Sequence, residues 1–370
     1  LSGVFNNPLN AFFESVSGFT TTGATVINSL ESLSHSLLFW RSFIHWLGGM
    51  GIIAVVIIMI PELSANIFIY NRETTGPFNN RIRASIKETA YLLWYIYLIL
   101  TILEIIFLHL YGMPFFDSLI HSFGTISTGG FSNSSLSIKI YNNINLEIIV
   151  IIFMYLSGIN FEVYYHGIKR GIKTIFNNEE VKLYSFIILI STILIAININ
   201  YTLYSNILIS LRHALFQVIS IITTTGFATV NYDIWPSFSR WILLILMALG
   251  GCAGSTAGGM KIIRIIILYK AIKQEMKRLI YPEIVEKIKI NKRVVSDKIV
   301  KNILGFFFLY ISIIVIVVLL LTSTGLDLIS SLSATLSALG NVGPGLKLIG
   351  PLNSFAVLTP FGRTLLIICM

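Results

Sequence analysis

Long apolar runs alternate with polar linkers along the whole chain. The runs contain few charges and cover residues 37–60, 90–110, 146–165, 183–204, 241–268 and 303–322, with a seventh from about residue 355. A membrane-crossing helix needs about 20 consecutive apolar residues, and each complete run meets or approaches that length. The pattern therefore predicts a chain that crosses a membrane several times.

The ends of the sequence indicate a piece of a longer protein. The chain begins at Leu1 without an initiator methionine, and it ends at Met370 inside the seventh apolar run. We therefore expect the first span to be missing and the last span to be truncated.

Composition supports the membrane class. Apolar residues make up 55% of the chain and charged residues only 12%, about half of the ~25% typical of soluble globular proteins. This balance excludes an ordinary soluble enzyme. The two cysteines, Cys252 and Cys369, lie in glycine-rich or apolar stretches, so they provide neither a disulfide framework nor a metal-binding pair.

The basic residues indicate orientation. Linkers 61–89, 167–182 and 261–301 together contain 20 of the 26 Lys and Arg residues, twelve of them in the last linker. By the positive-inside rule, all three linkers are expected on the cytoplasmic side. The cytoplasmic placement of these linkers explains the net charge of +9. We favour this explanation over nucleic-acid binding, which would also require a basic stretch.

A shorter segment that ends in Ser, Thr and Gly lies between the two long runs of each unit. Its four copies are 13–24, 121–131, 216–227 and 332–344. Segments of about 10–15 residues are too short to cross a bilayer and are typical of re-entrant helices. One unit of span, half-length helix, turn and span is therefore predicted to occur four times. The predicted fold class is an all-α membrane protein whose four tandem repeats surround one pore in pseudo-fourfold arrangement.

Such turns suit a bare cation. Irregular backbone at membrane depth is tolerated only inside protein or along a water-filled cavity. Four turns around one axis would present rings of carbonyl oxygens, which can replace the hydration shell of a monovalent cation. Glycine permits the required backbone angles. The C-terminal ends of the half-length helices also favour a cation, and Asp117 and Asp327 suit the opposite ends of two of them.

These segments resemble the four pore regions of the Trk/Ktr/HKT superfamily of potassium transporters, and the bacterial Trk and Ktr subunits most closely. The resemblance covers essentially the whole chain. It also rests on the stretches 45–53 (His-Trp-Leu-Gly-Gly-Met-Gly-Ile-Ile), 72–77 (Arg-Glu-Thr-Thr-Gly-Pro), 87–94, 127–131 and 250–259.

The resemblance implies that the turns form a potassium filter. The implied filter residues, which would also contact K+, are Thr22, Gly23, Thr128, Gly129, Thr225, Gly226, Val342 and Gly343, flanked by Thr21, Ser127, Thr224 and Asn341. The fourth copy is the weakest match, because Val342 replaces the Thr before its glycine. Some plant relatives with Ser at the first filter position favour sodium, so Gly23 favours potassium. A sodium-permeable or mixed cation transporter is the alternative.

The glycine-rich run 250–259 interrupts an apolar span and has two interpretations. In a continuous helix, Gly250, Gly254 and Gly258 would form a small-residue face for close helix packing. In a broken helix, the run would form a loop below the filter that blocks or opens the pore. The resemblance implies such a gate, made of Gly251, Ala253, Gly254, Ser255, Thr256, Ala257, Gly258 and Gly259.

Several polar residues at membrane depth have two interpretations each. Glu104 could bind an ion or face a neighbouring helix, and Glu14 could add negative potential near the pore or complement a helix end. His45 and Trp46 are expected to be packing or interface residues. The family arginine of the last span is expected beyond the end of this sequence, so Arg363 is instead expected near the outer interface.

Two other function classes are disfavoured. A membrane enzyme would need a catalytic motif, but the chain has no HExxH, and Met260 stands where a phosphate-binding loop requires Lys. A carrier for a small organic solute typically has paired repeats and a polar midplane site. Four copies of a backbone-rich turn favour a dehydrated ion over an organic solute.

The chain is therefore divided into 1–60 (repeat 1), 61–89 (linker), 90–166 (repeat 2), 167–182 (linker), 183–270 (repeat 3 with the gate), 271–301 (linker) and 302–370 (repeat 4). The expected function is potassium uptake across the bacterial plasma (inner) membrane, with filters toward the outer side and no enzyme activity. No cofactor is expected in this chain, and K+ is the transported ion.

The resemblance also implies partners. Relatives assemble as homodimers in membrane lipid, on cytosolic nucleotide-binding regulatory subunits (TrkA/KtrA-like). The basic linker 261–301 is the expected docking surface, with Lys287, Lys289, Lys292 and Arg293 as the residues to reverse in charge.

Overall fold

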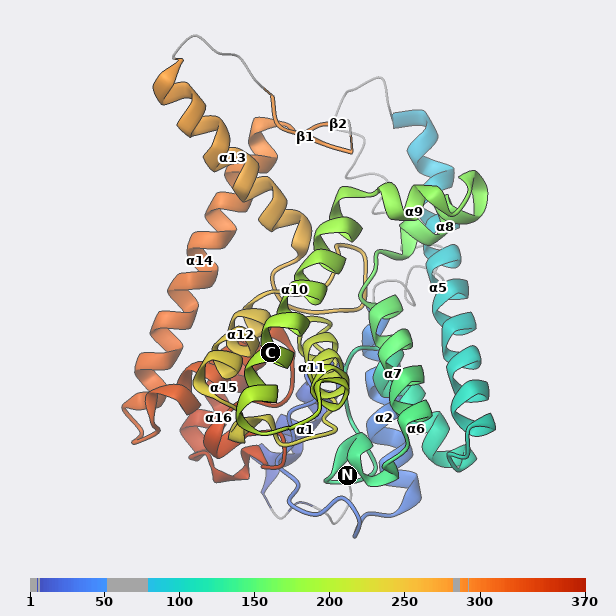
Figure 1. Ribbon diagram of the computed structural model, residues 1–370, viewed down its shortest axis with the longest axis vertical. Helices are drawn as coiled ribbons and strands as arrows, with labels where there is room; N and C mark the ends of the chain where they lie inside the picture. The colour runs from blue at the N-terminus through green and yellow to red at the C-terminus, as the bar shows by residue number, and fades with distance from the viewer. Residues whose placement is uncertain (1–4, 6, 52–78, 282–286, 292) are drawn as a thin grey trace.

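The computed structural model describes residue 5 and residues 7–51, 79–281, 287–291 and 293–370 (Figure 1). Within these ranges, helices account for nearly all regular structure, as predicted for an all-α protein. The exception is a short antiparallel hairpin of β1 (Lys289–Ile290) and β2 (Arg293–Val294), which lies inside the basic linker 261–301.

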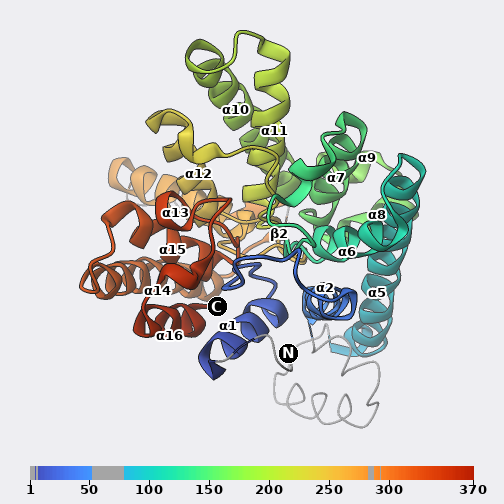
Figure 2. The same ribbon diagram turned by 90° about the horizontal axis from the view of Figure 1, so that it is seen from below.

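Four half-length helices form at the predicted short segments. They are α1 (Pro8–Phe19), α6 (Phe115–Ile126), α11 (Ile207–Ile222) and α15 (Leu328–Gly340). Polar side chains define their starts: Asn7, Asn206 and Asp327 accept backbone N–H groups at the N-caps, and Asp117 lies in the first turn of α6. Seen from below, the four helices lie on different sides of a common centre (Figure 2).

Long apolar helices surround this centre. Among the described residues, three helices are long and apolar enough to cross a membrane: α5 (Asn79–Leu110, with its apolar part from Leu93), α10 (Glu179–Thr202) and α14 (Asp297–Thr322). The first apolar run forms α2 (His35–Gly49), and its remainder lies outside the described residues. Side chains such as Phe308 and Leu319 of α14 are largely exposed, as expected for a surface in contact with lipid.

Two predicted spans are broken. The run 146–165 forms α7 (Ile144–Ser157) and α8 (Phe161–Arg170), which are bent by 93°. The bend follows from a new helix start, since Asn160 accepts the N–H of Glu162 as the N-cap of α8. The run 241–268 forms α12 (Ser237–Ala248) and α13 (Ile262–Ile280), separated by residues 249–261.

The remaining elements are short. They are α9 (Lys173–Asn177), α16 (Pro360–Cys369) and the 3-10 turns η2 (Ser137–Tyr141), η3 (Tyr232–Ile234), η4 (Lys347–Ile349) and η5 (Phe355–Val357). Several helix boundaries differ from the predicted division of the chain. Helix α10 begins before residue 183, and α13 and α14 extend into the linker 271–301, because these helices continue past the apolar run into polar turns.

The two ends of the chain pack together. One buried cluster combines Phe13 of α1 with Val317 of α14, Ala334 of α15 and Leu366 of α16. The larger cluster joins α5, α6, α7, α10, α11 and α12. Helices from the end of the chain therefore pack against α1 at its start (Figure 2).

Candidate ion pore

All four half-length helices end in the same backbone turn. A residue with positive φ lies one or two residues past the end of each helix, and a glycine with positive φ follows two residues later. The residue pairs and their φ angles are Thr21 and Gly23 (56° and 78°), Thr128 and Gly130 (54° and 75°), Thr224 and Gly226 (58° and 79°), and Asn341 and Gly343 (55° and 96°). Because side chains with a Cβ disfavour this region, glycine suits the second position.

The structure shifts the register of the second turn by one residue. The residue before the glycine donates its N–H to the carbonyl five residues earlier, at 2.9 Å in every copy: Thr22 to Ser17, Gly129 to Gly124, Thr225 to Ser220, and Val342 to Ser337. Gly129 therefore corresponds to Thr22, and Gly130 is the equivalent of Gly23. The predicted alignment of Gly129 with Gly23 is wrong, because two consecutive glycines allow either match and only the backbone distinguishes them.

The four turns pack against one another in a closed cycle. A Cβ at Gly23 would overlap the carbonyl oxygen of Gly129, one at Gly130 that of Thr225, and one at Gly226 that of Val342. A Cβ at Gly343 would lie 2.9 Å from the carbonyl oxygen of Thr22 and complete the cycle. Real side chains do not fit such approaches, so glycine is required here for space as well as for φ.

Four main-chain oxygens in this cycle lack protein donors. Within the described part of the chain, no N–H or O–H donates to the carbonyl oxygens of Thr22, Gly129, Thr225 and Val342. All four residues are buried. Buried carbonyls are normally paired, so four unpaired ones in equivalent positions indicate a site for a ligand that replaces a donor.

Serine side chains hold the chain after three of the four turns. Ser17, Ser220 and Ser337 each donate a hydroxyl hydrogen bond of 2.6 Å to a carbonyl at or just after the glycine. The second copy has Gly124 at this position, where a Cβ would lie 2.9 Å from the Phe131 carbonyl oxygen. In the first, third and fourth copies, the backbone beyond the turn is thus fixed to its own half-length helix.

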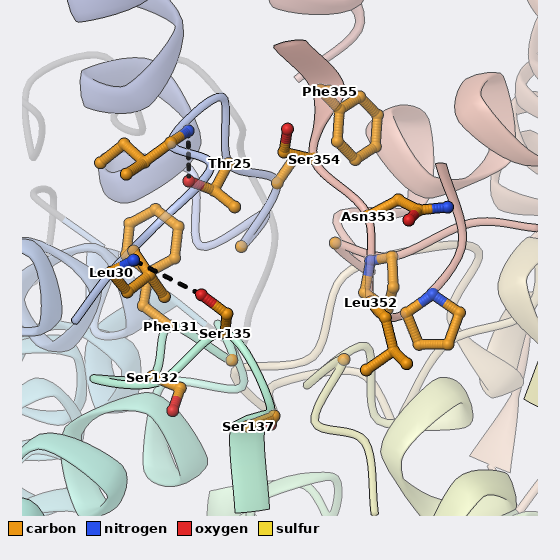
Figure 3. Close-up of a pocket in the computed structure, with 18 of the residues that line it drawn as sticks. Thr25, Leu30, Phe131, Ser132, Ser135, Ser137, Leu352, Asn353, Ser354 and Phe355 are labelled. Atoms are coloured by element: carbon orange, nitrogen blue, oxygen red, sulfur yellow. Dashed lines mark hydrogen bonds between the residues drawn. The ribbon is translucent and has the colours of Figure 1, made fainter. Parts of the chain in front are cut away.

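A cavity of about 450 Å3, named the outer cavity after the predicted orientation, opens onto the cycle and is lined in part by the four positive-φ glycines. Figure 3 shows Thr25, Phe131 and Ser132 on one side and Leu352 to Phe355 on the other. Glu31 connects two outer loops, since its carboxylate accepts the Ser135 N–H at 2.8 Å and the Ser134 hydroxyl at 3.1 Å.

Glu14 is a structural residue beside the first turn. Its Oε1 accepts from Arg41 Nε at 3.0 Å and Nη2 at 2.6 Å, and Oε2 accepts the Val26 N–H at 3.1 Å. Arg41 also stacks on the Phe131 ring at 4.0 Å. Because a buried arginine pairs with Glu14, the structure favours a packing role over a contribution of negative potential to the pore.

His45 and Trp46 pack behind the second turn, as expected. The His45 ring stacks on Phe131 at 3.8 Å, and its Nδ1 lies 3.4 Å from the Phe131 nitrogen. A Cβ at Gly129 would overlap this ring, so His45 closes the space behind that residue. Trp46 donates to Thr101 Oγ1 at 3.1 Å.

The segment 249–261 is a loop and lies against the C-terminal ends of the half-length helices. Gly258 donates its N–H to Thr224 Oγ1 at 2.7 Å, and Thr256 Oγ1 donates to the Ile126 carbonyl at 3.0 Å. A Cβ at Gly258 would overlap the Gly340 carbonyl oxygen. The continuous small-residue helix is therefore wrong for this segment, and the loop contacts three of the four turns.

The predicted gate residues lie in two different environments, some against the turns and others against the bend between α7 and α8. Thr256 and Gly258 face the turns, whereas Gly251 and Gly254 pack against Gly158 and Asn160 where α7 bends into α8. Ser255 donates to the Cys252 carbonyl within the loop, and Ala253, Ala257 and Gly259 contact Glu180, Lys261 and Leu249 respectively.

Two charged residues that the sequence analysis missed fasten this loop. Glu180 of α10 is buried, and its Oε1 accepts the N–H groups of Ala253 at 2.7 Å and Ile263 at 3.0 Å. Lys261 Nζ donates to the Ala257 carbonyl and lies 3.5 Å from the Ser255 carbonyl. The sequence signal for Glu180 was an acidic pair at the start of a predicted span, and Glu179 shares that signal but pairs with Lys270.

Glu104 and Arg363 are also buried. Glu104 lies beside Thr125 of α6, so it faces a neighbouring helix behind the turns rather than the cycle itself. Arg363 is buried in α16 and donates to Asn10 Oδ1 in α1. It therefore connects the fourth repeat to the first, a buried contact that differs from its expected place at the outer interface.

The chain matches a known family over nearly its full length. The TrkH family model, described as cation transport protein, covers residues 4–370. The Trk system potassium uptake protein TrkH of Salmonella typhimurium is 37% identical over 362 residues, which are 97% of this chain and 74% of that protein. TrkG of Escherichia coli, also named a Trk system potassium uptake protein, is 34% identical over 98% of this chain and 75% of that protein.

A solved structure agrees with these matches. The crystal structure of the potassium transporter TrkH from Vibrio parahaemolyticus has a TM-score of 0.84 and 36% sequence identity, and covers 98% of this chain and 75% of that one. The fold is thus that of a membrane transport protein and not of an enzyme. From the family match, the identities and the shared fold together, the chain belongs to the TrkH family of cation transport proteins.

Proposed function

We propose that this protein takes up potassium through a pore formed by the four turns in pseudo-fourfold arrangement. The observation that carries the proposal is the closed cycle of turns with unpaired, buried carbonyl oxygens at Thr22, Gly129, Thr225 and Val342. Carbonyl oxygens can replace the hydration shell of a bare alkali cation. The names of the relatives, potassium uptake proteins of Trk systems, supply the choice of ion.

The filter then consists of eight residues, two from each turn. They are Thr22, Gly23, Gly129, Gly130, Thr225, Gly226, Val342 and Gly343, with Thr21, Ser127, Thr128, Thr224 and Asn341 flanking them. Val342 fits this role because its contribution is a main-chain oxygen, which does not depend on the side chain. Asn341 adds a link between the fourth and first turns, since its Nδ2 donates to the Thr20 carbonyl at 2.5 Å.

The loop 249–261 is the proposed gate. Its contacts with Thr224, Ile126 and Gly340 put it across the helix ends that a conducted ion would pass. Opening requires the loop to leave these contacts, and therefore to loosen the bonds made by Glu180 and Lys261. Non-helical backbone at membrane depth is typical of such discontinuous helices in transporters.

The proposed orientation places the basic linkers in the cytoplasm and the outer cavity outside, in a bacterial inner membrane. An inside-negative potential then drives a cation inward with about 2.3 kcal/mol per 100 mV. Membership of a Trk system supports a complex with other subunits. We propose a homodimer on a cytosolic nucleotide-binding regulator, docked on linker 261–301 through Lys287, Lys289 and Arg293; Lys292 of the same predicted set lies outside the described residues.

Rubidium and sodium uptake by the full-length protein, in cells that lack their own potassium uptake systems, tests this function. Gly226→Asp should abolish uptake because its side chain would overlap the Val342 carbonyl, and Gly23→Ser should abolish it as well because a Cβ there would overlap the Gly129 carbonyl. Gly305→Ala is the matched control, because nothing lies within 4 Å of a Cβ at that glycine. Wild-type rubidium uptake by a membrane-inserted Gly226→Asp protein would refute the filter.

A further inference from the structure

A second cavity lies on the side of the fold away from the outer cavity, between α13 and the β1–β2 hairpin. Its volume is about 420 Å3, and lysine is its main lining residue. Lys270, Lys273 and Lys277 come from one face of α13, and Lys287 and Lys289 come from the opposite wall, with Gln274 and Ile288 between them. We call this cavity the lysine pocket.

The walls of the lysine pocket are fixed to each other. Lys270 Nζ donates to the Lys289 carbonyl at 2.7 Å and pairs with Glu179 of α10. Glu179 also accepts the Asn291 N–H at 2.9 Å, and Asn291 Oδ1 accepts the Glu179 N–H at 2.9 Å. The hairpin is therefore anchored to the start of α10, so the pocket is a formed cavity rather than a gap between mobile segments.

The described lining of the pocket is basic, and Lys270 in that lining is paired with Glu179 of α10. Among its described lining residues none is acidic, and Glu275, which is close in sequence, pairs with Arg278 at 2.8 Å instead. Residues three and four apart share a helix face, so the spacing of Lys270, Lys273 and Lys277 directs three ammonium groups to one side. The positive-inside rule requires basic residues in this linker, but it does not require them to converge from two walls on one cavity.

We propose that the lysine pocket binds a phosphate-bearing anion. Lys273, Lys287 and Lys289 bring three further ammonium groups to a cavity where Lys270 is paired with Glu179, and a multiply charged phosphate would balance their charge while accepting hydrogen bonds from them. Basic pockets at the cytoplasmic ends of membrane helices bind phospholipid headgroups by this chemistry, and a soluble polyphosphate offers the same groups. Exposed apolar side chains on the adjacent face of α13, Ile272 and Met276, would suit the lipid source.

The test uses the full-length protein in phosphatidylcholine nanodiscs. One arm titrates inorganic pyrophosphate by calorimetry, and the other adds phosphatidylglycerol to the nanodiscs and measures retained lipid by native mass spectrometry. Lys273→Gln with Lys287→Gln removes one charge from each wall. Lys298→Gln with Lys301→Gln on α14 is the matched control, since it removes the same charge outside the pocket lining.

We expect the pocket variant to bind at least about tenfold more weakly than wild type, which corresponds to about 1.4 kcal/mol, while the control variant binds as wild type does. A response to pyrophosphate identifies a soluble phosphate source, and a response to phosphatidylglycerol alone identifies a headgroup. The proposal is overturned if neither probe binds, if the pocket variant binds normally, or if the control weakens binding equally. Because no step requires transport, these outcomes are independent of the proposed function.

Discussion

Replacing Glu180 with Gln is the most direct perturbation of the proposed gate. The carboxylate of Glu180 accepts two N–H groups, from Ala253 within the loop 249–261 and from Ile263 just after it. The amide of Gln has nearly the same shape but carries no charge, so it keeps the packing and weakens both hydrogen bonds. We therefore expect the loop to leave its closed position more often, and ion flux to rise.

The magnitude follows from the two hydrogen bonds. A hydrogen bond to a charged group contributes about 1.5–3 kcal/mol, against about 0.5–1.5 kcal/mol for a neutral one. Losing about 1 kcal/mol from each bond shifts the balance toward the open loop by about 2 kcal/mol, or roughly 30-fold. Glu180→Ala, which removes both hydrogen bonds, should shift it further.

The assay is rubidium flux into proteoliposomes that contain the full-length protein, combined with hydrogen exchange of the loop amides. Glu179→Gln is the matched control, because this neighbouring carboxylate pairs with Lys270 and accepts the Asn291 N–H instead. Faster exchange at Ala253 and Ile263 should accompany the higher flux. Unchanged flux in Glu180→Gln, or an equal rise in Glu179→Gln, would show that this carboxylate does not hold the gate.

Three further predictions concern the turns and the outer loops. Arg41→Leu should lower stability by about 3–5 kcal/mol, because Glu14 is left buried without its partner, and a melting temperature equal to wild type would contradict this. Gly130→Ala should abolish potassium uptake, because a Cβ there overlaps the Thr225 carbonyl; normal uptake would favour the alternative register with Gly129. Partial burial raises the pKa of Glu31, but hydrogen bonds from Ser135 and Ser134 outweigh it and lower the pKa from 4.5 to about 2. Glu31 therefore stabilises the outer loops above pH 4.5, and this stabilisation is lost as pH falls toward 2. The melting temperature of Glu31→Gln should then lose the part of its acid dependence that comes from this carboxylate. If the melting temperature of the variant falls with pH as that of wild type does, another group causes the dependence.

The sequence by itself determined the class of protein and the position of its repeated parts. Span length, half-length segments and glycine turns are set by local hydrophobicity and local backbone preference, so they are readable without knowing any contact. The same local logic identified 250–259 as an interruption of a span. It left open whether that stretch was helical, because glycines at every fourth position also fit a helix face.

Only the tertiary structure decided the register of the second turn, the bend after Ser157 and the partners of the buried charges. Glu14 and Arg41 are 27 residues apart, and Glu180 and Ile263 are 83 apart. Asn341 and Thr20, which join the fourth turn to the first, are 321 apart. The physical reason is that a buried charge or carbonyl is satisfied by whichever group folding brings beside it, and that neighbour is a property of the packed molecule rather than of the adjacent sequence.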